Sequence, residues 1–224
     1  MFVRCPRRSL LFWLRNCDAT CRHLTPPPSG QQRPTQNGVM DDIVRQAIAK
    51  WPHVPSCFGW LGLDARGNWY MRDDQVQAMG PFSGPGSPPA GASKGSLLKH
   101  DKLVDFIQRN YESDAQGQWF FQNGPQRVYV ELEATPLVWR VDGPPDFVVT
   151  AHTGQRARVQ RCVVDEHGRV YLETDAGFGL VHTLDMTHAA DAIEWGLWVP
   201  AELPACELPA RFGYVRSPQA LQKE

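Results

Sequence analysis

Residues 114–142, DAQGQWFFQNGPQRVYVELEATPLVWRVD, decide the fold class because their apolar side chains repeat with a period of two. Between 127 and 132, valine and leucine alternate with arginine, tyrosine and glutamate. Such alternation places the apolar set on the core side of a β-strand and the polar set on the other side. Turn residues separate this run from similar runs that follow it. Short strands with short connections predict an antiparallel meander.

The segment begins with an octet, DAQGQWFF (114–121), that the chain writes twice more in similar form. DARGNWYM occupies residues 64–71, and DEHGRVYL occupies residues 165–172. Aspartate first and glycine fourth are typical of a type I turn followed by a left-handed residue, which is a favoured hairpin loop. We interpret the octets as three hairpin tips. A degenerate duplication and a propeller, whose blades have a similar period, remain open alternatives.

Helical periodicity is limited to three places. Apolar stripes predict helices over about 41–50, 98–110 and 186–196. The sequence therefore predicts an α+β fold, in which an antiparallel sheet of six or more strands packs against two or three helices.

We expect a single domain over residues 40–217. Within it, a Gly/Pro-rich stretch at 80–97 is expected to be a flexible loop, and residues 218–224 a disordered tail.

The first 39 residues differ from the remainder in composition. They carry six arginines, no lysine and one acid, which sum to +5, so the total of −1 leaves −6 for residues 40–224. We expect a disordered basic extension over 1–39, while Met40 opens a stretch typical of a protein start. A start site assigned too early, a genuine extension and an organelle transit peptide are all compatible with this pattern.

Several classes of function lack support in the sequence. A net-acidic body disfavours nucleic acid as a partner, and no apolar run long enough for a membrane span is present. Nucleotide-binding glycine motifs and the Gly-x-Ser-x-Gly elbow are missing. The three widely spaced cysteines of the body favour buried thiols over disulfides or a zinc site. We predict no cofactor.

One stretch could bear metal chemistry. HTLDMTH contains His182, Asp185 and His188, and His152 could approach from another turn. On one continuous helix these three would spread around the axis, so they converge only if a strand ends near His182. A metal-assisted hydrolase that uses these four residues is the alternative hypothesis.

Aromatic residues beside arginines are the other candidate site. Exposed on one sheet face, they would form a surface for stacking and for binding anions. The residues of this predicted surface are Trp69, Tyr70, Trp119, Arg127, Tyr129 and Arg140.

The stretch from MDDIVRQAIAKWP through CFGWLGLDARGNWYMRDD to FIQRNYESDAQGQWFFQNGPQRVYVELEATPLVWRV resembles a small proteobacterial family with no assigned function. The resemblance covers Met40 to about Ser217. It implies a bacterial, cytoplasmic protein and supplies no catalytic residues. The leading hypothesis is a non-enzymatic domain that binds an unidentified protein or small-molecule partner.

Overall fold

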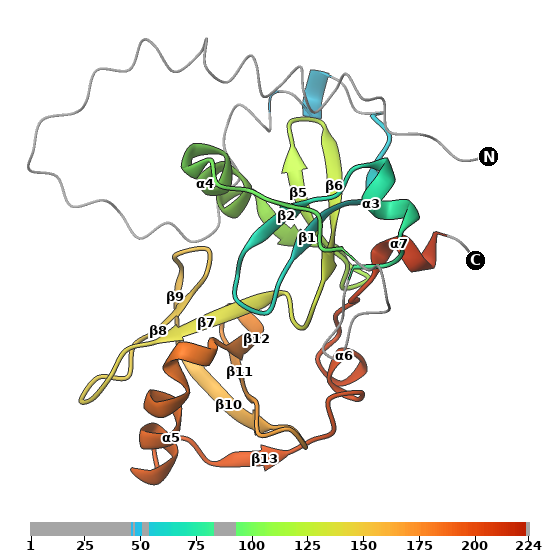
Figure 1. Cartoon of the computed structure of the whole chain (residues 1–224). Coiled ribbons are helices and arrows are strands. Elements are labelled where there is room, and N and C mark those ends of the chain that lie inside the picture. The colour runs from blue at the N-terminus through green and yellow to red at the C-terminus, as the bar shows by residue number, and fades with distance from the viewer. Residues whose placement is uncertain (1–45, 47, 51–53, 83–92, 223–224) are drawn as a thin grey trace, which may run out of the picture.

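The computed structural model describes residues 46, 48–50, 54–82 and 93–222. They form two β-sheets with helices at their ends and faces (Figure 1).

The expected segments at the start of the chain lie mostly outside this described part. The extension predicted at 1–39 does so completely, while residues 46 and 48–50 of the helix predicted at 41–50 are helical. Of the loop predicted at 80–97, residues 83–92 lie outside.

The first sheet has six strands. Across the sheet the order is β3 (Ser96–Leu97), β2 (Trp69–Met71), β1 (Cys57–Leu63), β6 (Gln126–Leu132), β5 (Trp119–Asn123) and β4 (Tyr111–Ser113). Neighbours are antiparallel except β1 and β6, which run parallel.

The second sheet has seven strands. Its order is β13 (Pro200–Glu202), β10 (Val159–Val164), β11 (Val170–Thr174), β12 (Gly177–Val181), β7 (Leu137–Val141), β8 (Val149–Ala151) and β9 (Arg156–Ala157). The pairs β10–β13 and β12–β7 are parallel. The α+β class is therefore right, but the prediction of one purely antiparallel meander is wrong. Alternation predicts a strand without indicating which distant strand becomes its neighbour.

The three octets lie at the turns that join β1 to β2, β4 to β5 and β10 to β11, each an antiparallel pair. One carboxylate oxygen of the aspartate accepts the backbone N–H groups two and four positions later, at 2.8–3.0 Å. The glycine has φ between 72° and 82°, a region that a Cβ penalises. These pairs are Asp64 with Gly67, Asp114 with Gly117, and Asp165 with Gly168.

Helices complete the described fold: α3 (Asp74–Ala78), α4 (Asp101–Arg109), η2 (Thr183–Asp185), α5 (Met186–Glu194), α6 (Leu208–Arg211) and α7 (Pro218–Leu221). Both α4 and α5 fall where helical periodicity predicts them. His100 caps α4, because its Nδ1 accepts the N–H of Leu103 at 3.3 Å. In the described part of the chain, none of the helices combines the length and apolarity that crossing a bilayer needs.

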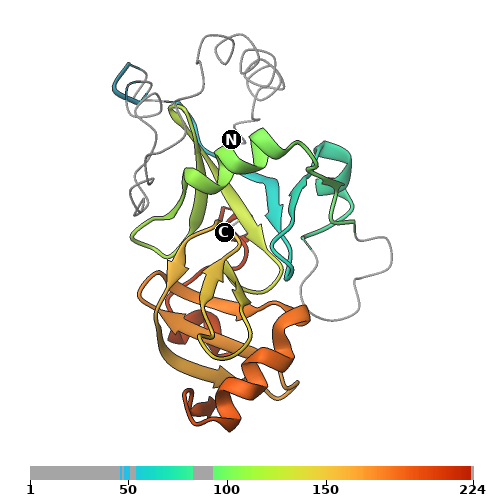
Figure 2. The ribbon, with the colours of Figure 1, turned by 90° about the vertical axis from the view of Figure 1, so that its left-hand side faces the viewer.

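The two sheets share an apolar core. Leu63 of the first sheet and Val163 of the second belong to one buried cluster. A second cluster is formed by side chains of the seven-stranded sheet and of α5, whose Ala189 and Ala192 are fully buried. Figure 2 shows α5 at the end of the molecule away from the first sheet.

A bend between β9 and β10 curls the second sheet. These strands stand near opposite ends of the strand order, yet only Arg158 separates them in sequence. Arg158 N–H donates to Asp175 Oδ1 at 2.9 Å, and Asp175 N–H donates to the Arg158 carbonyl at 3.2 Å. The bend is thereby fixed against the β11–β12 turn.

Candidate binding groove

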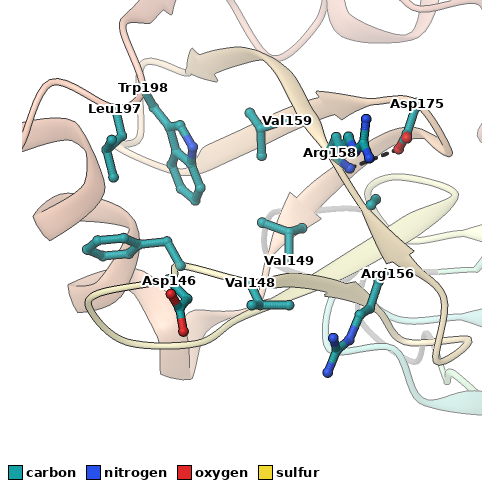
Figure 3. Close-up of a pocket in the computed structure, with 11 residues that line it drawn as sticks. Asp146, Val148, Val149, Arg156, Arg158, Val159, Asp175, Leu197 and Trp198 are labelled. Carbon is teal, nitrogen blue, oxygen red and sulfur yellow. Dashed lines mark hydrogen bonds between the residues drawn. The ribbon is translucent and has the colours of Figure 1, made fainter.

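A groove of about 580 Å³ lies at this bend. Its walls come from four segments far apart in the sequence: the loop before β8, the β9–β10 bend, the β11–β12 turn and the chain after α5 (Figure 3). The volume falls within the range of small-molecule sites.

One end of the groove is apolar. Leu197 and Trp198 form this end, and Val149 and Val159 lie between it and the opposite end (Figure 3). Trp198 and Val149 belong to the core inside the second sheet, whereas Leu197 is 57% exposed. Side chains at the edge of the core therefore line the groove.

Phe147 supports this apolar end with a strained backbone. Its φ is 45°, which bulky side chains rarely adopt, and it is buried. Its ring contacts Trp195 edge-on, with centroids 5.3 Å apart. Backbone strain of this kind persists where packing enforces it, and it recurs at ligand sites.

The opposite end is polar. Arg156 and Arg158 are exposed there, together with Asp175 (Figure 3). Among the described residues neither arginine forms an ion pair. Asp146 lies toward the apolar end, below Leu197 and Trp198 in Figure 3.

The sequence-predicted aromatic surface is divided by the fold. Trp69 is 1% exposed between the sheets, with its ring edge-on to Tyr111 at 5.1 Å. Trp119 is half-buried and packs against the same Tyr111 ring, with centroids 4.8 Å apart. Tyr70 donates its hydroxyl to Asp64 at 3.3 Å, and burial, followed by Asp64, raises the pKa of this phenol.

Arg127 and Tyr129 do share one face of β6, as alternation predicts. The Arg127 guanidinium lies over the Phe120 ring, and the Tyr129 ring packs against the same ring. Tyr129 is nevertheless buried, and its hydroxyl donates to Asp114 at 3.1 Å. Arg140 belongs to the other sheet. The six residues therefore do not form one continuous surface.

Three of the four candidate metal ligands, His182, Asp185 and His188, belong to one short stretch, and each already has a hydrogen-bond partner within the fold. Asp185 accepts bonds from the Arg140 guanidinium, with one at 3.1 Å, and from the Val141 N–H at 3.1 Å. Burial alone would raise the pKa of the Asp185 carboxyl, but these bonds outweigh it and lower the pKa. His182 accepts the N–H of Leu184 through Nδ1.

His188 and His152 complete the set. His188 Nδ1 bonds to the Val141 carbonyl at 2.8 Å. His152 is partly buried, its Nδ1 accepts the Val138 N–H at 3.3 Å, and burial lowers its pKa to about 4. Its ring packs near Trp69. The structure does not bring these four side chains to one point.

Another group of potential ligands does come together. In the part of the chain that the structure describes, the ligand atoms of Asp165, Glu166 and His167 lie within 4.8 Å of one another. Asp165, however, already accepts the Arg169 guanidinium at 2.6 Å and the Tyr171 hydroxyl at 2.9 Å. The other Asp165 oxygen accepts the N–H groups of His167 and Arg169, so both oxygens are already engaged within the turn.

The cysteines offer no activated nucleophile among the described residues. Cys162 is a buried thiol whose pKa burial raises to about 11, and Cys206 is an exposed thiol. Cys57 is buried in the core between the sheets.

Sequence reasoning missed the residues of the groove. The stretch LWVP at 197–200 is apolar, but nothing in it indicates that Leu197 stays exposed. Arg156 and Arg158 flank a single alanine in a short strand, and this is the nearest available signal.

The protein therefore has an α+β fold and a groove whose volume would fit a small molecule. The chain belongs to the family DUF2944, described as "Protein of unknown function (DUF2946)", whose model matches residues 40–219. This match confirms the resemblance seen in the sequence. A crystal structure of a DUF1285 family protein from Silicibacter pomeroyi DSS-3 is similar, with a TM-score of 0.42 and 12% identity, covering 70% of this chain and 79% of that one. None of the curated proteins matches the chain.

Proposed function

We propose that this chain is a non-enzymatic binding domain whose site is the groove at the β9–β10 bend. The observation that carries the proposal is the 57% exposure of Leu197 on a groove whose floor is the edge of the buried core. A bound apolar group would cover Leu197 and extend the packing around Trp198. Burial of apolar surface supplies roughly 25 cal/mol per Å² toward binding.

A small molecule suits the groove better than a protein surface. Specific protein interfaces are broad, at about 800 Å² per partner, whereas walls on several sides favour a compact ligand. The sequence resemblance to a proteobacterial family supports a bacterial, cytoplasmic setting.

Binding of the neutral fluorescent probe N-phenyl-1-naphthylamine tests the proposal. We expect Leu197→Asp to weaken it about tenfold, because the charge removes apolar contact worth more than 1 kcal/mol. Val199→Asp is the matched control, since Val199 is 81% exposed and lies outside the groove lining. No binding by the unmodified chain, or equal losses in both variants, would contradict the proposal.

A further inference from the structure

We infer that the ligand of this groove is an organic anion, with its apolar body against Leu197 and Trp198 and its acidic group held by Arg156 and Arg158. The inference rests on the proposed binding at the groove and adds the chemistry of the ligand.

The first support is the position of the two arginines along the groove, away from its apolar end. The arginines lie at the end opposite Leu197 and Trp198, with valine side chains between (Figure 3). A molecule lying along the groove would therefore contact apolar groups at one end and guanidinium groups at the other. This arrangement matches an amphipathic anion.

The second support is the charge at the polar end. This end carries two arginines, Arg156 and Arg158, and one carboxylate, Asp175, so its net charge is positive, while the second aspartate of the lining, Asp146, lies toward the other end. The Asp175 carboxylate is fixed by accepting the Arg158 backbone N–H at 2.9 Å, so its position serves the bend. No such bond holds the two guanidinium groups in the described structure.

The third support is a contrast with the other arginines of the second sheet and its turns. Each of them faces a carboxylate: Arg140 pairs with Asp185, Arg161 with Glu173 and Arg169 with Asp165. Only the two groove arginines, among those described in this sheet, are left to bind an external anion. A guanidinium offers five N–H donors in a plane that suits carboxylate and sulfonate oxygens.

A pair of probes with one apolar body tests the inference. 8-Anilinonaphthalene-1-sulfonate carries an acidic group that N-phenyl-1-naphthylamine lacks. We expect the double variant Arg156→Gln/Arg158→Gln to bind the sulfonate roughly fivefold more weakly, the scale of exposed charge pairs. Binding of the neutral probe should stay within about twofold. Arg161→Gln is the matched control, because Arg161 is exposed on the same sheet but lies outside the groove lining.

The outcomes separate the two proposals. Selective loss of sulfonate binding, together with weaker binding at high salt for the sulfonate alone, supports the inference. If both probes lose affinity equally, or the sulfonate loses none, the anion is not held by these arginines and the inference fails while the groove remains a binding site. If the unmodified chain does not bind the neutral probe, the proposed function fails as well.

Discussion

Alanine at Gly117 should destabilise the protein far more than alanine at Gly168, although both residues hold the same turn position. Their φ values are 75° and 72°. A Cβ on Gly117 would lie 2.1 Å from the Gly213 carbonyl oxygen, whereas a Cβ on Gly168 meets nothing within 4 Å. Gly168→Ala therefore isolates the cost of backbone conformation, and Gly117→Ala adds a collision with backbone.

The magnitudes follow from these two terms. Left-handed backbone costs a non-glycine residue about 1–2 kcal/mol, and the less flexible unfolded chain returns about 0.4–1 kcal/mol. We expect Gly168→Ala to lower the free energy of unfolding by about 1 kcal/mol. In Gly117→Ala the C-terminal segment must also move, which disturbs the bond from Val215 N–H to the Gly117 carbonyl at 2.9 Å. The expected total is about 3 kcal/mol.

Urea unfolding measures both variants against the unmodified chain. The midpoint should shift while the slope with denaturant stays constant. Equal destabilisation by the two substitutions would refute the docking of the 114–118 turn against the C-terminal segment. No destabilisation by Gly168→Ala would refute the strain at the glycine position.

Three further changes test individual contacts. Stability should fall by about 3 kcal/mol as pH drops from 6.5 to about 4, because the unfolded chain protonates His152 there and the folded chain, with its pKa of about 4, does not; urea midpoints of His152→Gln should lose most of this slope, and an unchanged slope would contradict the assignment. Arg140→Gln should lower the free energy of unfolding by about 1–2 kcal/mol, because it leaves the buried Asp185 carboxylate without its cation; the loss is limited because Arg140 is 54% exposed and water weakens the pair. A thermal melt unchanged from the unmodified chain would show that the pair does not contribute to stability. Trp139→Phe should cost about 2–3 kcal/mol, since the fully buried indole N–H donates to the Leu172 carbonyl at 3.1 Å; a loss below 1 kcal/mol in urea unfolding would contradict that bond's role.

Local chemistry in the sequence predicts much of the local structure. Asp165 and Gly168 bend the chain because a short carboxylate bonds to nearby N–H groups and glycine accepts positive φ, and both effects act within five residues. Alternation also separates Arg127 from Val128 on β6, since Arg127 is exposed and Val128 is buried. It is wrong about Tyr129 and Glu131, which it predicts on the solvated face and which are buried.

Long-range arrangement is what local patterns leave undetermined. The parallel pairing of β12 with β7 joins strands about 40 residues apart, and the sequence of neither strand specifies its partner. Trp69 is a residue type that often binds ligands, yet the packing of one sheet on the other buries it. The groove depends on the bend at Arg158 and on the place where the chain leaves α5, so it has no contiguous sequence signature.

Chemical-shift mapping tests the central claim, that the groove at the β9–β10 bend is the binding site. N-phenyl-1-naphthylamine would be titrated into the ¹⁵N-labelled chain, with backbone amide shifts followed by residue. We predict that the largest changes fall on residues 146–149, 156–159 and 197–198. Changes concentrated instead on the face of β6 that carries Arg127 and Tyr129 would contradict the claim.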